Sequence, residues 1–208
     1  SDWSSDVCSS DLLTRSFVRS ISTAMPKALV AISEGSEELE AIGIIDILRR
    51  GKVHVTVASI DESKKVKCAR GCSLTADVLI GDVKSDTFDA IVLPGGMPGA
   101  EHLRDCHTLV SMLGKQKEAG RIYAAICASP AVVFATHDLL DGYATCYPSF
   151  KDQIEHFKNE KVVVSDNCIT SQGPGTVIDF ALKLVEVLCG KETSEKVRKG
   201  LIDRKSVV

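Results

Sequence analysis

The stretch Arg121-Ile-Tyr-Ala-Ala-Ile-Cys-Ala-Ser-Pro130 combines the end of a strand, a turn and the start of a helix. Residues 122–126 form an apolar run that favours a strand, and the run stops at Cys127. Small residues follow, and residues 131–135 (Ala-Val-Val-Phe-Ala) have a helical pattern. We therefore expect a buried strand that turns at Cys127 into a helix.

The same alternation of strand and helix extends along the chain on both sides of this stretch. Several of the expected strands are short and apolar throughout, as in a parallel sheet covered on both faces. The expected fold class is therefore α/β, a flavodoxin-like three-layer α/β/α sandwich whose ligands bind at the carboxyl ends of the strands. The expected strands are residues 28–32, 53–60, 66–68, 73–75, 90–93, 122–126, 143–145, 162–164 and 168–170, and the expected helices are residues 36–50, 106–118, 129–136, 174–189 and 192–201.

The composition limits the class of protein. With 208 residues, of which 44% are hydrophobic and 25% charged, the chain is typical of one soluble globular domain. A net charge of −3 does not suggest a nucleic-acid partner, and no apolar run approaches the roughly 20 residues of a membrane span. The eight cysteines include no C-x-x-C pair, and the histidines do not have metal-ligand spacing. We therefore expect free thiols in a reducing compartment, and no metal or other cofactor.

The two ends of the chain do not match its middle. Residues 1–12 (SDWSSDVCSSDL) are aperiodic and rich in Ser and Asp, and we expect these residues and residues 203–208 to be foreign to the folded protein. Residues 13–24 contain arginines and serines but no acid. This composition suits part of an organelle transit peptide, or else an untranslated region of the message that was read as protein before a true start at Met25. We expect one domain over residues 25–202, located in the cytoplasm, or in mitochondria or another organelle if residues 13–24 are a targeting segment.

Cys127 is the first candidate for chemistry. At a strand-to-helix turn its sulfur lies beside free N–H groups of the helix start, which favour the reactive thiolate. A turn of this kind also directs a nucleophile out of the edge of an α/β sheet. The alternative is that Cys127 is a small buried apolar residue, as free cysteines often are.

An acidic segment from Ser33 to Glu40 opens the first long helix. Ser36 is expected to cap this helix, and acidic residues in a first turn are favourable for stability alone. The helical period, however, places Glu40 on the apolar face and Glu38 at its border. Burial would raise the pKa of Glu40 towards neutrality, so Glu40 is the candidate acid/base.

The strand at residues 90–93 is followed by a glycine loop, Pro94-Gly-Gly-Met-Pro-Gly-Ala100. The N–H groups of Gly95 and Gly96, with that of Ala128, are candidates for an oxyanion hole. A simple turn between strand and helix is the alternative, because the loop lacks the spacing of a nucleotide-binding motif. Tyr147 is a candidate for hydrogen bonding to a substrate carbonyl, or else a packed aromatic residue beside a proline. No histidine is placed as an evident base for Cys127.

Five motifs together resemble the DJ-1/ThiJ/PfpI superfamily, and most closely its DJ-1 subgroup, over residues 25–202. The resemblance implies a homodimer, a reactive and oxidisable Cys127 at a nucleophile elbow, and a Glu40 carboxyl hydrogen-bonded to it. It also implies anion binding by the amides of Gly96 and Ala128, with Arg70 and the Gly173-Pro174 turn near the site and the dimer interface. The motifs are Lys27-Ala-Leu-Val, Glu37-Glu-Leu-Glu40, Val92-Leu-Pro-Gly-Gly96, Ala124-Ala-Ile-Cys-Ala128 and Thr170-Ser-Gln-Gly-Pro-Gly-Thr176.

The activities that this resemblance implies are of two kinds. One is a cofactor-independent glyoxalase or deglycase that converts methylglyoxal and related 2-oxoaldehydes to 2-hydroxy acids. The other is a redox-sensing, stress-protective protein or chaperone that acts through oxidation of Cys127. Two departures from the family matter: Tyr147 stands where some members have a histidine, and Ala128 stands where the protease-type relatives have one, which argues against peptidase activity.

Overall fold

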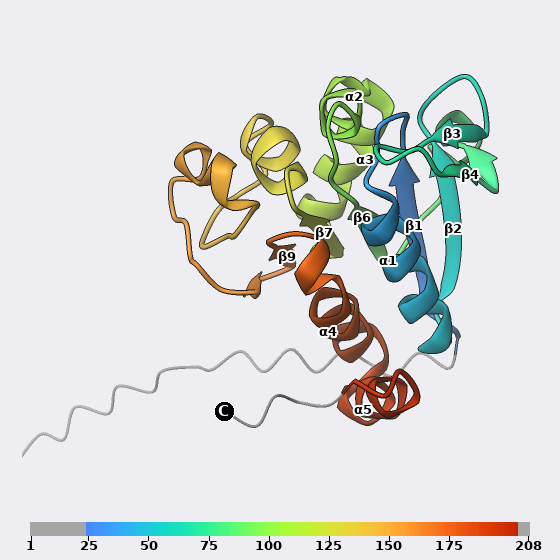
Figure 1. Ribbon diagram of the computed structural model, residues 1–208, viewed down its shortest axis with the longest axis vertical. Helices are drawn as coiled ribbons and strands as arrows, with labels where there is room; N and C mark the ends of the chain where they lie inside the picture. Colours follow the sequence, from blue (N-terminus) through green and yellow to red (C-terminus); the bar gives the residue numbers. More distant parts are fainter. Residues whose placement is uncertain (1–23, 204–208) are drawn as a thin grey trace, which may run out of the picture.

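The computed structural model describes residues 24–203, and the expectations for residues 1–23 and 204–208 lie outside this part of the chain. Its centre is a seven-stranded sheet in the order β5-β2-β1-β6-β7-β9-β8 (Figure 1). Only β8 is antiparallel to its neighbour, and the other pairs are parallel. The strands are β1 (Lys27–Ile32), β2 (His54–Ser59), β5 (Val78–Leu79), β6 (Ala90–Leu93), β7 (Ile122–Ile126), β8 (Val162–Ser165) and β9 (Cys168–Ser171).

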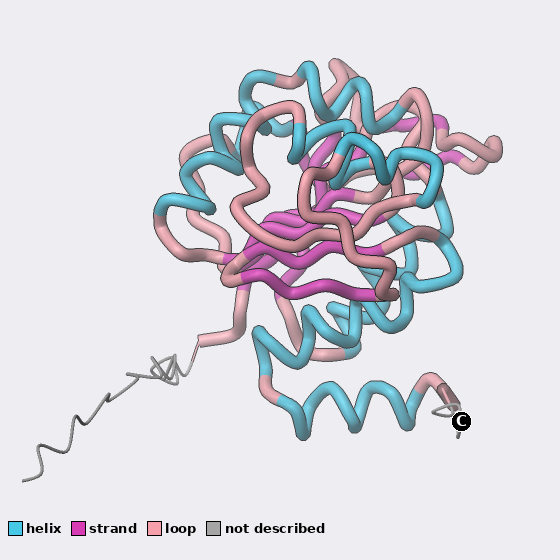
Figure 2. Tube along the Cα trace, turned by 90° about the vertical axis from the view of Figure 1, so that its left-hand side faces the viewer, coloured by secondary structure: helices cyan, strands magenta, loops and turns pink. Residues whose placement is uncertain are grey.

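Helices cover both faces of this sheet (Figure 2). Successive side chains of a strand point to opposite faces, so Val30 packs in the core that contains α1 and α4, and Leu29 in the core that contains α2 and α3. The predicted three-layer sandwich is confirmed. No helix within residues 24–203 has the length and apolar character to cross a membrane. The α-helices are α1 (Glu38–Arg50), α2 (Gly99–Asp105), α3 (His107–Glu118), α4 (Val177–Cys189) and α5 (Lys191–Gly200).

A separate hairpin of β3 (Lys65–Lys67) and β4 (Ser73–Thr75) packs on the start of α1, and its two strands were expected from the sequence. The Glu38 carboxylate accepts the backbone N–H of Arg70 at 2.9 Å and that of Cys72 at 3.3 Å. Burial acts to raise the pKa of Glu38, but the backbone N–H groups of Glu38 itself, Arg70 and Cys72 outweigh it and hold this pKa below the ordinary value. Glu38 is thus an anchor for the hairpin tip.

The start of α1 differs from the prediction. Ser36 is not the helix cap, because its Oγ accepts the N–H of Ser33 at 3.0 Å. Glu37 is the cap, and its carboxylate accepts the N–H of Glu40 at 2.7 Å. The cap therefore fixes the backbone of Glu40 itself.

Other elements also differ from those expected, and the two-residue strand β5 was not predicted. The segment 143–145 is not a strand, and only Ala144 forms a bridge, to Phe157. The predicted helix at 129–136 is a π-helix, η2 (Pro130–Ala135), followed by further turns. The sequence did not predict α2, because its Pro- and Gly-rich start favours a loop. Short 3-10 helices are η1 (Ile80–Val83), η3 (Pro148–Gln153) and η4 (Pro174–Thr176).

Replacement of Gln116 is expected to destabilise the sheet. This side chain is 2% exposed, and its Nε2 donates to the carbonyls of Phe88 at 3.2 Å and Ile122 at 2.9 Å. Gln116→Ala leaves both carbonyls without this donor, so we expect a loss of about 2–3 kcal/mol in the free energy of unfolding, measured by urea denaturation. Gln172→Ala is the matched control, because the Gln172 amide makes an exposed hydrogen bond, and should cost less than about 0.5 kcal/mol. Equal losses in both variants would contradict this role for Gln116.

Candidate active site

Three strands that lie side by side bring the predicted site residues together. β1, β6 and β7 are adjacent and parallel, so their carboxyl ends meet at one edge of the sheet. The Glu37 N–H donates to the Gly95 carbonyl at 2.9 Å and joins the loops after β1 and β6. A Cβ built on Gly95 would lie 2.5 Å from the Cβ of Cys127 and 3.0 Å from Oε2 of Glu40. A side chain at position 95 would therefore collide with both the thiol-bearing residue and the carboxyl, and only glycine fits beside them.

Cys127 occupies a sharp elbow between β7 and η2. Its φ of 66° lies in the left-handed region, which is strained for a residue with a side chain. Two backbone hydrogen bonds hold it there: its N–H donates to the Ser171 carbonyl at 3.0 Å, and its carbonyl accepts the N–H of Tyr147 at 2.7 Å. The side chain is almost buried, at 9% exposure. This is the geometry of a nucleophile elbow, in which the backbone turn aims the side chain.

Glu40 lies in the first turn of α1 and is completely buried. Its Oε2 accepts the N–H of Gly95 at 2.7 Å. Its Oε1 is buried and has no hydrogen-bond partner of ordinary geometry within residues 24–203. The carboxyl faces the Cys127 thiol, and this contact acts to lower the pKa of Glu40. The prediction that Glu40 faces inward is therefore correct, and its carboxyl lies beside the Cys127 thiol.

Burial controls the protonation of this pair. It raises the pKa of Glu40 to about 7, although the Gly95 hydrogen bond opposes the shift. Burial and the negative charge of Glu40 raise the pKa of Cys127 to about 12, outweighing the N–H groups of Gly96 and Ala128, which act in the expected direction. Since two negative charges side by side are disfavoured, the pair loses one proton near neutral pH, from the carboxyl, and the thiol keeps the other.

The predicted oxyanion residues divide into two groups. The N–H groups of Gly96 and Ala128 act on the sulfur of Cys127 and stabilise negative charge there. The inclusion of Gly95 among the substrate-binding amides needs correction, because its N–H is already bound to Glu40. Gly96 has a φ of 93°, and a Cβ there would lie 2.5 Å from the Glu37 nitrogen, so the loop requires glycine at this position.

Tyr147 reaches the site through its backbone, by the hydrogen bond to Cys127 described above. Its side chain is 44% exposed, and its Cδ2 lies 3.3 Å from a Cβ built on Gly173. Tyr147 and the Gly173-Pro174 turn are thus neighbours near the elbow, on the exposed side. The hydroxyl has no role that this geometry defines.

Ser129 was not identified from the sequence, where it resembled a small spacer between Cys127 and the helix. It is completely buried, and its Oγ donates to the carbonyl of Pro94 at 2.5 Å. A polar residue two positions after the elbow, in an otherwise apolar segment, was the available signal. This hydrogen bond ties the elbow to the glycine loop.

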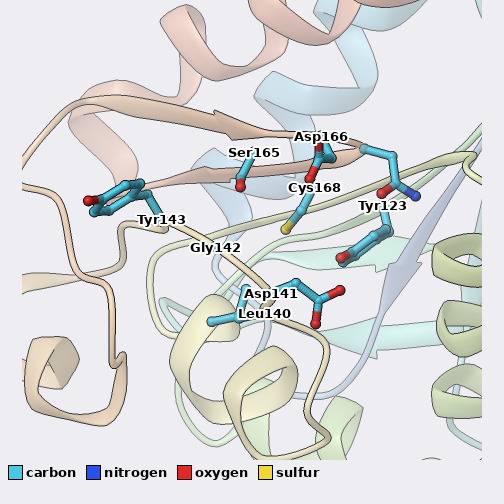
Figure 3. A pocket seen from close by; sticks show the side chains of 9 residues that line it. Tyr123, Leu140, Asp141, Gly142, Tyr143, Ser165, Asp166 and Cys168 are labelled. Carbon is cyan, nitrogen blue, oxygen red and sulfur yellow. The ribbon is translucent and has the colours of Figure 1, made fainter. Parts of the chain in front are cut away.

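The described residues 24–203 contain no group of three His, Cys, Asp or Glu side chains arranged to hold a metal ion. A small cavity of about 20 Å³ lies among Tyr123, Asp141 and Cys168, with the Cys168 side chain directed into it (Figure 3). Tyr123 and Cys168 are at the amino-terminal ends of β7 and β9, away from Cys127. The cavity has room for about one water molecule and is separate from the candidate site.

Alkylation of Cys127 by iodoacetamide is expected to follow the titration of the Cys127–Glu40 pair. In the wild type the rate should keep rising well above neutral pH, because burial and the charge of Glu40 raise the pKa of the thiol to about 12. In Glu40→Gln the midpoint should move down, because the substitution removes the negative charge and the hydrogen-bonding carboxyl that raise the pKa of Cys127. The rates are measured by mass spectrometry of the Cys127 peptide.

The control for this titration is Glu118→Gln, which removes the same charge from an exposed position at the end of α3. Its midpoint should equal that of the wild type. An unchanged midpoint in Glu40→Gln would show that Glu40 and Cys127 do not titrate together.

Known proteins with this fold are similar over most of the chain. A model of the DJ-1/PfpI family matches residues 26–187. Protein DJ-1 homolog B of Arabidopsis thaliana is 45% identical over 85% of this chain and 41% of its own length, so the chain spans less than half of that relative. Glutathione-independent glyoxalase DJR-1.2 of Caenorhabditis elegans is 39% identical over 86% of this chain and 97% of its own length. The solved structure of oxidised DJ-1 from Toxoplasma gondii has a TM-score of 0.84 and 47% identity, covering 85% of this chain and 98% of its own. These matches confirm the resemblance seen in the sequence, and the chain belongs to the DJ-1/PfpI family.

Proposed function

We propose that this protein is a glutathione-independent glyoxalase that converts methylglyoxal and related 2-oxoaldehydes to 2-hydroxy acids through the thiolate of Cys127. The observation that best supports this is the buried Glu40 carboxyl, whose pKa is raised to about 7 beside the thiol. Such a group takes up and releases protons near neutral pH, which the isomerisation of an oxoaldehyde requires. No metal or organic cofactor takes part in the proposed reaction.

The proposed reaction begins when the sulfur of Cys127 adds to the aldehyde carbon and forms a hemithioacetal. The N–H groups of Gly96 and Ala128 stabilise the negative oxygen that develops. Glu40 gives this oxygen a proton, removes the proton on the former aldehyde carbon, and returns a proton to the neighbouring carbon through an enediol. The resulting thioester is hydrolysed by water, which releases the 2-hydroxy acid and restores the thiol. Methylglyoxal and water together account for all atoms of lactate.

The glyoxalase name of the Caenorhabditis elegans relative supports this proposal. Deglycation of early adducts is proposed as a related activity, because the adduct of an oxoaldehyde with an amine or thiol presents the same carbon to Cys127. The exposed Tyr147 is proposed to border the entrance for substrate.

We also propose that the protein is a homodimer. Leu39 and Ile42 are exposed on α1, and Ile42 lines a hollow of about 330 Å³. The rest of its lining is apolar in part, with Ile45, Val57 and Leu74, and polar in part, with Asp46, Arg49, Thr75 and Asp77. Apolar side chains gathered on one exposed helix favour a protein partner, and a second copy presents the same face. The cysteines of residues 24–203 are all free, which supports a reducing compartment such as the cytoplasm.

Purified protein is expected to convert methylglyoxal to lactate in a buffer without glutathione. Cys127→Ser should reduce this rate on the order of a thousandfold, because the nucleophile is lost. The measurement is enzymatic detection of lactate over time. Cys106→Ser is the control, since this thiol lies at the start of α3, and it should leave the rate unchanged. Equal rates in the wild type and in Cys127→Ser would exclude the proposed reaction.

The second candidate function is redox sensing by Cys127, which the solved structure of oxidised DJ-1 from Toxoplasma gondii favours. The amides of Gly96 and Ala128 that act on the sulfur are also donors for the oxygens of a sulfinic acid.

Mild treatment with hydrogen peroxide is expected to add two oxygen atoms to Cys127, detected by peptide mass spectrometry. The exposed Cys72 is the internal comparison, and oxidation of Cys72 at the same rate would contradict selective sensing.

A further inference from the structure

One peptide unit connects the Ser129 hydroxyl to the Glu40 carboxyl. The carbonyl of Pro94 accepts the Ser129 Oγ–H at 2.5 Å, and the N–H of Gly95 donates to Oε2 of Glu40 at 2.7 Å. This carbonyl and this N–H belong to the same amide, between Pro94 and Gly95. Ser129 and Glu40 are both completely buried, so neither bond competes with water.

The position of this amide explains why it needs a side-chain donor. The ladder between β6 and β7 ends at Leu93 and Ala125, so the Pro94 carbonyl lies beyond the last paired residues. A buried carbonyl at that point requires another partner. Ser129 is the partner, and the short turn after Cys127 delivers its hydroxyl there.

A hydrogen bond at one end of an amide changes the other end. Donation to the carbonyl oxygen increases the double-bond character of the C–N bond and makes the N–H a stronger donor. Cooperative strengthening of this kind is about 10–30% per bond. A stronger Gly95 donor stabilises the ionised form of Glu40 more than the protonated form.

We propose that Ser129 is a positioning residue that holds and polarises the Pro94–Gly95 peptide and thereby sets the pH at which Glu40 gives up its proton. Its effect on turnover rests on the proposed function, whereas its effect on Glu40 does not. The other titratable groups that act on Glu40 within residues 24–203 are Cys127, whose thiol lies beside the carboxyl, and Glu37, in the turn before α1. Substitution of Ser129 removes neither of these two groups.

The test is the titration of Glu40 in the full-length protein, followed by carbon-13 NMR of glutamate carboxyl groups. The Glu40 resonance is identified by its loss in Glu40→Gln. In Ser129→Ala the midpoint should rise by about half a pH unit, because the Gly95 N–H becomes a weaker donor. Ser129→Thr retains a hydroxyl and should restore the wild-type midpoint.

Ser194→Ala is the matched control. Ser194 is also buried, and its Oγ donates to a backbone carbonyl, that of Leu182, at 2.8 Å, far along the chain from the elbow. This variant loses the same kind of bond and should leave the Glu40 midpoint unchanged. An unchanged midpoint in Ser129→Ala, or a Thr variant that behaves like the Ala variant, would overturn the proposal.

Two further measurements keep the test decisive. If Ser129→Ala does not fold, Ser129→Cys provides a weaker donor of similar size, and its midpoint should lie above that of the wild type; an unchanged value would overturn the proposal. The pH profile of lactate formation should shift with the NMR midpoint. If the wild type forms no lactate, the glyoxalase proposal fails, while the NMR titration still decides the role of Ser129.

Discussion

The burial of the Glu40 carboxyl beside the Cys127 thiol is the interaction on which the rest of the candidate site depends. In water, the carboxyl would be ionised at neutral pH and the thiol would be neutral. In the protein, desolvation raises the pKa of Glu40 to about 7, so this carboxyl takes up and releases its proton near neutral pH while the thiol stays protonated. Each nearby feature either permits this pair to form or controls where its charge resides.

The backbone around the pair shows how closely it is supported. Glycine at position 95 leaves room for the carboxyl to reach the thiol, and its N–H binds that carboxyl. The amides of Gly96 and Ala128 stabilise charge on the sulfur instead. Neighbouring amides of one loop thus favour negative charge on different atoms. The proposed glyoxalase reaction and the proposed oxidation of Cys127 would both depend on the amides that act on the sulfur, because each places negative charge next to it.

Hydrogen bonds hold the strained backbone of Cys127 in place at the elbow. Cys127 is in the left-handed region, and its backbone is bound on one side to Ser171 and on the other to Tyr147. Ser129 adds a buried side-chain bond to the loop after β6. A conformation that costs energy persists only where the surroundings determine it strongly, and such places are often functional.

The sequence by itself determined the layer architecture, most of the strands and the meeting of three loops at one edge of the sheet. It did so because apolar periodicity decides which faces are buried, and because parallel strands place their carboxyl ends together. It also identified Glu40, since a carboxyl on the apolar face of a helix is costly to bury and such groups gather at functional sites. The tertiary structure alone decided that Glu37 rather than Ser36 caps α1, that the N–H of Gly95 binds Glu40, and that Ser129 bonds to Pro94. Those assignments depend on which donor meets which acceptor across distant segments, and local sequence patterns do not encode that geometry.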